Sequence, residues 1–288
     1  MASTAVRSDT IPTTANAYQR RRHDAELTIN DAFEWRETAS GRALVCVALE
    51  PYAPHLFTTR EWLLGAAGDG DRAAAWATLA RAMGVDEAHL ARAHQVHGAS
   101  LIVRRAADAP GPEHEALADA DILVSDDPSL VLAIQTADCV PLLIADRRTG
   151  AVAAAHAGWR GLAAGVPGAT VGALAREFGS APGDLVAAVG PSISAERYEV
   201  GADVHERFAA AGFSAAQLER WLLPGFRPDR LQFDGCRSAG DQLVAAGLAS
   251  ANVHVSALCT ASHPDLFCSY RRDGKGAGRI AAAIRKAG

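Results

Sequence analysis

One cysteine and two histidines have the types and surroundings of metal ligands. Cys139 lies in a Thr-Ala-Asp-Cys-Val-Pro segment between two apolar runs, and His156 directly follows another apolar run. His97 ends a His-Gln-Val-His segment before Gly98, and a strand would point His94 and His97 to opposite faces, so only one of them should enter a given site. A thiolate with two imidazoles suits zinc and leaves a fourth position for water or substrate. The long intervals between the three residues differ from the compact zinc-finger pattern.

Two arginine-bearing segments could bind an anion. Residues 156–161, His-Ala-Gly-Trp-Arg-Gly, join an expected strand to an expected helix. Backbone N–H groups, the start of a helix and the guanidinium of Arg160 would together attract a phosphate or carboxylate. Residues 267–274 place Arg271 and Arg272 beside Asp273 and a glycine, which predicts a second anion or carboxylate clamp.

Each of these residues also has a common structural explanation. A single histidine is usually hydrogen-bonded or exposed, a single cysteine is usually a small buried apolar residue, and a single arginine is usually solvated or ion-paired. Trp159, between two glycines, can simply pack in the core. Their clustering at the ends of expected strands favours a shared site. From the residues alone, a zinc hydrolase or lyase is one of several alternatives.

Short apolar strands and helices with apolar residues at helical spacing would position these segments. Strands are expected at residues 43–49, 100–104, 122–125, 130–135, 141–146, 151–155, 185–189 and 253–257. Helices are expected at residues 71–83, 163–178, 202–211, 239–246 and 278–286. The two types do not alternate strictly, which favours a layered α/β sandwich with a mixed sheet over a doubly wound parallel sheet.

Composition and charge exclude several classes of protein. The chain has 288 residues, of which 49% are hydrophobic and 21% charged, so a packed core is expected. A net charge of −5 argues against a general nucleic-acid binder. No apolar run approaches the roughly 20 residues that span a bilayer, and residues 1–22 lack the apolar part of a secretory signal. An odd, irregularly spaced set of five cysteines predicts reduced thiols in a cytoplasmic protein.

The chain is expected to form one domain. Residues 1–30 predict a flexible lead, and residues 31–288 a single catalytic domain. Residues 106–114, with two prolines and a glycine, are too short for a linker between domains and predict a loop.

Several segments, in order along residues 57–279, resemble the bacterial laccase-domain proteins. The most specific are the T-A-D-C-x-P string at 136–141 and the H-A-G-W-R-G string at 156–161. Further matches are residues 57–60, 94–98, 190–193, 198–201, 259–260 and 269–274. Members of this family have been described as multicopper polyphenol oxidases, zinc-dependent purine nucleoside phosphorylases and peptidoglycan editing factors.

The resemblance implies a fold, a metal and an activity. The fold is a single-domain four-layer α/β/β/α sandwich, and the metal is one zinc held by His97, Cys139 and His156, with copper as a substitute. The activity is phosphorolysis of adenosine, inosine, guanosine and methylthioadenosine, with deamination of adenosine. The implied partners are a purine nucleoside and phosphate, without nucleic acid or membrane, and a monomer is favoured.

Roles for the remaining motif residues follow from that chemistry as expectations. Arg60, Arg160 and Arg272 occupy arginine-bearing motif positions and are assigned to phosphate, with Arg160 also in the catalytic set. Asp138, beside Cys139, would transfer a proton or orient a ligand histidine. Trp159 would stack on the purine or pack in the core. Ser194, Arg197 and residues 274–278 depart from the usual family pattern, which leaves the substrate preference open.

Three other functions compete with the phosphorylase. A multicopper oxidase needs many histidine ligands, usually in His-X-His pairs, and the ten histidines here form no such pair. A cysteine hydrolase acting on peptidoglycan precursors would use Cys139 as nucleophile and His97 or His156 as base, both free of metal. A non-enzymatic protein with structural zinc would usually close the site with four ligands.

Overall fold

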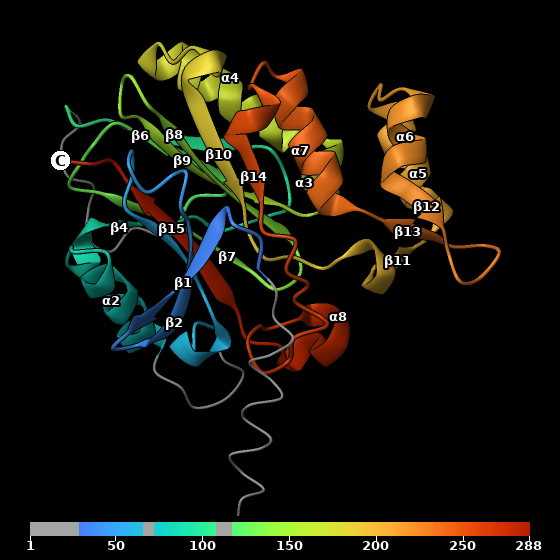
Figure 1. The fold of residues 1–288 in the computed structure, drawn as a ribbon, viewed down its shortest axis with the longest axis horizontal. Coiled ribbons are helices and arrows are strands. Elements are labelled where there is room, and N and C mark those ends of the chain that lie inside the picture. Colours follow the sequence, from blue (N-terminus) through green and yellow to red (C-terminus); the bar gives the residue numbers. More distant parts are fainter. Residues whose placement is uncertain (1–28, 66–71, 108–116) are drawn as a thin grey trace, which may run out of the picture.

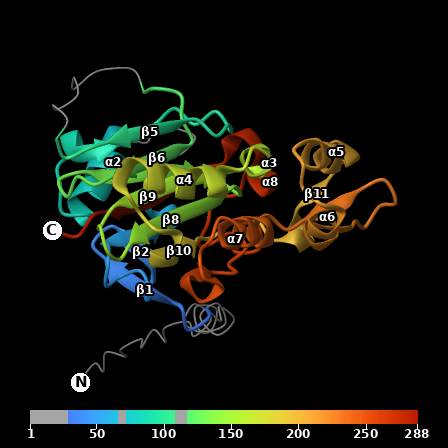
Figure 2. The same ribbon diagram turned by 90° about the horizontal axis from the view of Figure 1, so that it is seen from above.

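Two six-stranded sheets pack face to face, with helices over their outer faces (Figures 1 and 2). The computed structural model describes residues 29–65, 72–107 and 117–288. Most of the expected N-terminal lead, and residues 108–114 of the expected loop, lie outside these ranges. Among the described helices, none has the length and apolar character needed to cross a membrane.

The first sheet is mixed, because its outermost strand β4 runs parallel to β7 while the other neighbours are antiparallel. In spatial order its strands are β1 (Phe33–Thr38), β2 (Gly41–Cys46), β3 (His55–Thr58), β15 (Ile280–Arg285), β7 (Val131–Thr136) and β4 (Leu90–Ala91).

The second sheet is also mixed, with parallel pairs at its two edges and antiparallel pairs between them. In spatial order its strands are β14 (Val253–Val255), β10 (Leu185–Val189), β8 (Val140–Asp146), β9 (Val152–Ala157), β6 (Ile122–Ser125) and β5 (Leu101–Arg104).

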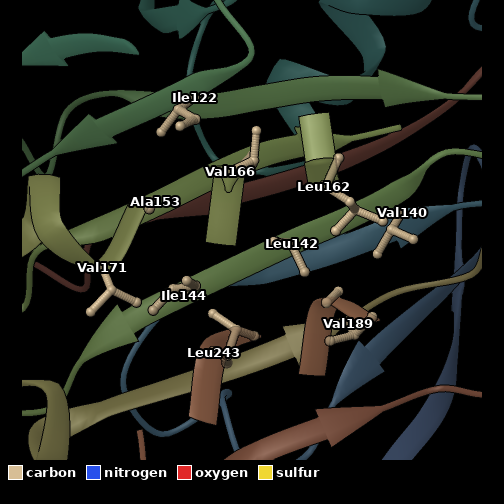
Figure 3. Packing of buried hydrophobic residues seen from close by; sticks show 14 of the residues in the cluster. Ile122, Val140, Leu142, Ile144, Ala153, Leu162, Val166, Val171, Val189 and Leu243 are labelled. Atoms are coloured by element: carbon tan, nitrogen blue, oxygen red, sulfur yellow. The ribbon is translucent and has the colours of Figure 1, made fainter. Parts of the chain in front are cut away.

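Three apolar cores separate four layers. Along β8, Leu143 and Ala145 belong to the core between the sheets, whereas Leu142 and Ile144 face the outer helices. Successive side chains of a strand point to opposite faces, so a strand covered on both faces is apolar throughout. Figure 3 shows the core between the second sheet and its helices. The outer helices are α2 (Arg72–Ala82) over the first sheet, and α3 (Trp159–Ala163), α4 (Val166–Phe178) and α7 (Gly235–Ala245) over the second.

A smaller unit projects from one side of the second sheet (Figure 1). It has its own aromatic cluster, in which the Phe208 ring centroid lies 5.9 Å from Trp221 and 5.2 Å from Phe233. Its elements are β11 (Glu199–Val200), α5 (Ala202–Ala210), α6 (Ala215–Trp221), β12 (Leu222–Pro224) and β13 (Leu231–Phe233). Short helical turns occur at α8 (Tyr270–Asp273), η1 (Arg60–Trp62), η2 (Glu87–His89), η3 (Pro182–Asp184), η4 (Ala195–Arg197), η5 (Ser250–Asn252) and η6 (Gly274–Gly276).

The structure confirms the α/β/β/α sandwich with mixed sheets and corrects two of the expected helices. Residues 278–286 were expected to be a helix, but Ile280–Arg285 is strand β15. This strand lies between β3 and β7 and is buried almost throughout, so pairing and packing override the helix propensity of its alanines. The expected helix 163–178 is two helices, α3 and α4, separated by Gly165 at φ +77°.

Candidate metal centre

His97, Cys139 and His156 converge on one point. Their ligand atoms all lie within 4.8 Å of one another, and in the described part of the chain this is the one group of three or more His, Cys, Asp or Glu that could hold a metal ion. The two imidazole rings meet edge to face, with centroids 4.8 Å apart. His156 is buried, whereas His97 is exposed, so the group is open on one side.

The two sheets together place the three candidate ligands. Cys139 lies in the short crossing from β7 of the first sheet to β8 of the second. His156 lies on β9, where it pairs with Pro141 at the start of β8. Because β8 begins where its antiparallel neighbour β9 ends, the thiol and the imidazole come close together.

His97 enters the group from a turn. Its φ of +61° is in the left-handed region, which a residue with a side chain rarely adopts. His94 forms an isolated bridge with Asp119 and its exposed ring bonds to that carboxylate at 2.7 Å. Of these two histidines, therefore, one alone reaches the group, as expected. The cause is the turn rather than the alternation of side chains along a strand.

Gly158 leaves room for the ligands. A Cβ atom at this position would lie 3.0 Å from Cys139 Sγ and 3.0 Å from His97 Cδ2. Both distances are tighter than ordinary contacts, so any larger residue would displace the thiol or the imidazole. Gly158 is also the N-cap residue of α3, which is five residues long.

Asp121 is hydrogen-bonded to both histidines, and it was not identified from the sequence. Its carboxylate is fully buried and accepts from His156 Nδ1 at 2.7 Å, from the His97 backbone N–H at 3.1 Å and from the Gly98 N–H at 2.7 Å. Because Nδ1 of His156 is engaged, Nε2 is the nitrogen available to a metal. The available signal is the position of Asp121 directly before the apolar strand β6. A carboxylate there is expected to be buried, and a buried charge needs hydrogen-bond partners.

The group is charged in a way that suits metal binding. Burial raises the pKa of the Cys139 thiol, but the charges and hydrogen bonds of His156 and His97 outweigh burial and lower that pKa to about 6. Burial lowers the pKa of His156, but the Cys139 thiolate and the Asp121 carboxylate raise it to about 9. The metal-free group is therefore a thiolate beside an imidazolium, and the thiolate is the form that binds metal.

The Asp138 carboxylate is hydrogen-bonded to Thr260 and Arg271 rather than to a candidate ligand histidine. Its Oδ1 accepts from Thr260 Oγ1 at 2.6 Å, and its Oδ2 accepts from the Arg271 backbone N–H at 2.6 Å. The alternative role of orienting a ligand histidine therefore belongs to Asp121. Asp138 has a φ of +87°, so it turns the chain just before Cys139.

Trp159 and Arg160 lie just beyond Gly158. The Arg160 guanidinium carbon lies 4.2 Å from the centre of the Trp159 ring. Arg160 is exposed, and no carboxylate of the described residues forms an ion pair with it. Trp159 is half-buried and packs against the core under the outer helices.

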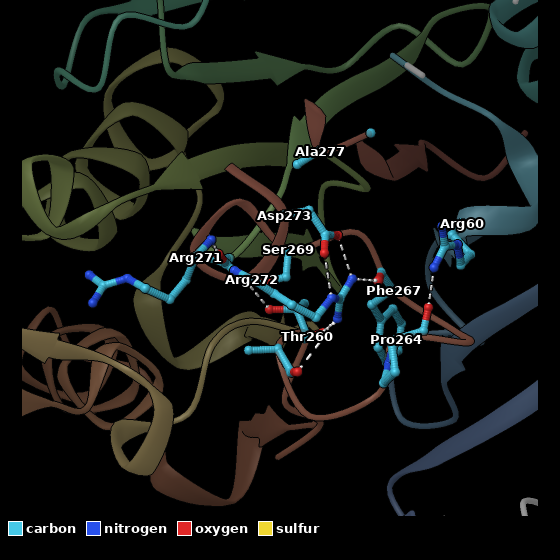
Figure 4. Close-up of polar contacts among 12 residues, drawn as sticks. Arg60, Thr260, Pro264, Phe267, Ser269, Arg271, Arg272, Asp273 and Ala277 are labelled. Atoms are coloured by element: carbon cyan, nitrogen blue, oxygen red, sulfur yellow. Dashed lines mark hydrogen bonds and ion pairs between the residues drawn. The ribbon is translucent and has the colours of Figure 1, made fainter. Parts of the chain in front are cut away.

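Arg60 and Arg272 belong to a neighbouring polar network (Figure 4). The Arg272 guanidinium donates to both Asp273 oxygens at 2.8 and 2.7 Å, to Thr260 O at 3.0 Å and to Phe267 O at 2.9 Å. The Arg60 guanidinium donates to Pro264 O. Both side chains therefore tie the segment before α8 to the rest of the fold.

Comparison with known proteins identifies the family of the chain. Residues 68–287 match the family model described as multi-copper polyphenol oxidoreductase laccase. A purine nucleoside phosphorylase of Deinococcus radiodurans is 37% identical over 243 residues, which are 80% of this chain and 88% of the relative. One of Bacteroides thetaiotaomicron is 39% identical over 170 residues, 59% of this chain and 62% of the relative. The adenosine deaminase RL5 of an unknown prokaryotic organism is 34% identical over 211 residues, 72% of this chain and 79% of the relative.

Solved structures share this fold over most of the chain. The hypothetical protein YfiH of Bacillus licheniformis superposes with a TM-score of 0.77 at 25% identity, covering 88% of this chain and 99% of that one. YlmD of Geobacillus stearothermophilus gives a TM-score of 0.77 at 26% identity, with the same coverage. The chain belongs to the multi-copper polyphenol oxidoreductase laccase family, whose relatives include proteins named purine nucleoside phosphorylase.

Proposed function

We propose that the protein is a zinc-dependent purine nucleoside phosphorylase that cleaves adenosine, inosine, guanosine or methylthioadenosine with phosphate. The relatives named purine nucleoside phosphorylase support an enzyme of this class. The observation that carries the proposal is the open His97–Cys139–His156 group with the unpaired cation of Arg160 two residues beyond Gly158.

The donor set fits zinc. Two imidazoles and a thiolate are borderline to soft ligands, and three protein ligands leave a position for substrate or water. Bound zinc would supply a Lewis acid that stabilises negative charge. Copper accepts the same donors, but a multicopper oxidase needs several such centres, and the described residues supply a single group. This favours the phosphorylase over the polyphenol oxidase.

The chain's own residues would bind and orient the two substrates. Phosphorolysis passes through an oxocarbenium-like state while phosphate attacks the sugar carbon and the purine leaves, so phosphate must be held by a fixed cation. Arg160 has that cation, and the half-buried Trp159 beside it offers an aromatic surface. The binding of phosphate by Arg60 and Arg272 stays a prediction, and their bonds within the protein favour a supporting role.

Deamination of adenosine is a second proposed activity, favoured by the relative named adenosine deaminase. It needs a group that moves a proton near the metal, and Asp138 is the carboxylate next to Cys139. Its two oxygens already accept from Thr260 and from the Arg271 backbone, so proton transfer would require one of these bonds to open.

A cysteine hydrolase would use the same Cys139–His156 pair without metal, because a thiolate of lowered pKa is also a nucleophile. Metal analysis separates the two functions. Protein with about one zinc per chain should release hypoxanthine from inosine, and adenine from adenosine, only when phosphate is present. Inosine formed from adenosine would establish the deaminase. Tightly bound zinc with both nucleosides untouched would refute the nucleoside assignment, and metal-free protein active on peptidoglycan precursors would establish the hydrolase.

A further inference from the structure

Arg271 differs from its neighbour Arg272 in what its side chain binds. The donors of Arg272 are directed at Asp273, Thr260 and Phe267 within the protein. The Arg271 side chain extends the opposite way, away from that network (Figure 4). It is exposed, and its guanidinium makes one hydrogen bond, from Nη1 to the backbone oxygen of Glu199 at 2.8 Å.

The Arg271 guanidinium is held in place and keeps donors free. Its carbon lies 4.8 Å from the centre of the Tyr198 ring, a distance typical of a cation–π contact. Tyr198 is itself fixed, because its ring packs against Phe233 with centroids 6.1 Å apart. No carboxylate of the described residues forms an ion pair with Arg271. Four of its five N–H groups therefore remain for a ligand.

The backbone of Arg271 is anchored to the metal-ligand turn. Its N–H donates to Asp138 Oδ2 at 2.6 Å, and Asp138 immediately precedes Cys139. The other oxygen of this carboxylate is bound by the buried Thr260 hydroxyl, so Asp138 is fixed from both sides. Asp138 thus connects the position of Arg271 to that of the ligand thiol.

The Tyr198 phenol lies among the charges of the site. Burial and the negative charges of Cys139 and Asp138 raise its pKa to about 12, while the cations of Arg271 and Arg160 oppose this shift. Both guanidiniums therefore act on the same phenol as the ligand thiolate. Arg160 lies two residues beyond Gly158, where a Cβ would be 3.0 Å from Cys139 Sγ, and Arg271 is bonded to Asp138, the residue before Cys139. Both arginines are therefore attached to the chain beside the same thiol.

We infer that Arg271 and Arg160 together bind inorganic phosphate beside the metal ligands, and that Asp138 is the positioning residue for Arg271. Two cations match the charge of a phosphate dianion, and a guanidinium fork can make paired hydrogen bonds to its oxygens. The inference rests on the proposed function for the role of phosphate as co-substrate, but binding of phosphate can be measured without turnover.

Calorimetric titration of inorganic phosphate into the zinc-loaded full-length protein tests the inference. Arg271→Gln should weaken phosphate binding at least tenfold, because it removes the positive charge and the paired N–H donors of the guanidinium. Arg271→Lys should fall between Gln and wild type, since it keeps the charge and loses the paired geometry. Arg81→Gln, on the outer helix α2, is the matched control and should bind phosphate as wild type does.

A double-mutant cycle tests the role of Asp138. Asp138→Asn cannot accept from the Arg271 N–H without turning its amide, so phosphate binding should weaken about threefold to tenfold. On the Arg271→Gln background the same change should have little further effect, because Asp138 acts through Arg271. Equal effects on both backgrounds would show that Asp138 has no positioning role. Thermal unfolding of each variant identifies any loss of phosphate binding that is caused by misfolding. If Arg271→Gln fails to fold, Arg271→Lys replaces it in the cycle, because lysine keeps the positive charge and the backbone bond to Asp138.

The outcomes separate this inference from the proposed function. If wild type binds phosphate, Arg271→Gln does not, and no nucleoside is cleaved, the inference stands and the phosphorylase fails. If nucleosides are cleaved and Arg271→Gln keeps the wild-type KM for phosphate, the inference is overturned and the phosphorylase stands. Absence of phosphate binding by the wild type at millimolar concentration also overturns the inference. In the expected case, the KM for phosphate rises at least tenfold and the KM for the nucleoside changes less than threefold.

Discussion

Replacing Asp121 by Asn should weaken zinc binding while leaving the shape of the site almost unchanged. The carboxylate is fully buried and accepts a charged bond from His156 together with the backbone N–H groups of His97 and Gly98. An Asn side chain has one oxygen, so at least one buried N–H loses its acceptor, at a cost of about 1–3 kcal/mol in the free energy of unfolding. Loss of a carboxylate behind a ligand histidine typically reduces metal affinity by about 10–100-fold.

The pH of the assay affects how much zinc affinity Asp121→Asn loses. In the metal-free protein the Asp121 carboxylate helps to hold the pKa of His156 at about 9, so at pH 7 a metal must displace a proton from this imidazole. Asp121→Asn lowers that pKa and so weakens the competition from protons. The affinity ratio between wild type and variant should therefore be larger near pH 9 than near pH 7.

Competition with a chromophoric chelator measures the zinc affinity of each variant. Asp119→Asn is the matched control, because it makes the same change two residues away, at an exposed carboxylate that also bonds a histidine. The control should bind zinc as the wild type does. A folded Asp121→Asn protein with zinc affinity within threefold of wild type at both pH values would refute the assignment of His156 as a ligand supported by Asp121.

Two further predictions concern the same group. Gly158→Ala should reduce the zinc bound per chain at least tenfold in competition with the chelator, because its Cβ would lie 3.0 Å from Cys139 Sγ. Gly168→Ala on α4 is the matched control, because a Cβ there meets nothing within 4 Å. This control should keep its full zinc content and gain up to about 1 kcal/mol of helix stability. Thiolate absorbance of the metal-free protein should fall with a midpoint near pH 6 as the pH is lowered, because Cys139 is protonated there, and zinc capture should fall with it. Cys139→Ser should lack this titration step, and a wild-type midpoint near pH 8 to 9 would contradict the thiolate–imidazolium pair.

The candidate ligand residues could be proposed from the sequence because their local sequence is unusual. Cys139 and His156 stand at the ends of apolar runs, and strand ends of a packed sheet are places where polar side chains can converge. The residues alone leave His94 and His97 open, and the family resemblance selects His97. The partners of these ligands were harder to predict, because the contacts of Asp121 join residues that are far apart along the chain. No periodicity in the sequence carries that information.

The choice between adjacent residues was also beyond the sequence. Arg271 and Arg272 are adjacent residues of the same type, so the sequence does not distinguish them. In the short α8, the Arg272 side chain bonds to Asp273 and the Arg271 side chain lies over the Tyr198 ring. The same limit applies to β15, because Ala and Ile at helical spacing also suit a strand buried on both faces. Only the position between β3 and β7 decides which structure forms.

Phosphate-dependent cleavage of inosine as a function of bound zinc tests the central claim most directly. Metal-free protein would be titrated with zinc from zero to two equivalents, and the release of hypoxanthine followed with and without phosphate. We predict a rate that rises with zinc, saturates at one equivalent per chain and vanishes without phosphate. Equal rates for metal-free and zinc-loaded protein, or no cleavage of any purine nucleoside at one equivalent, would contradict the account.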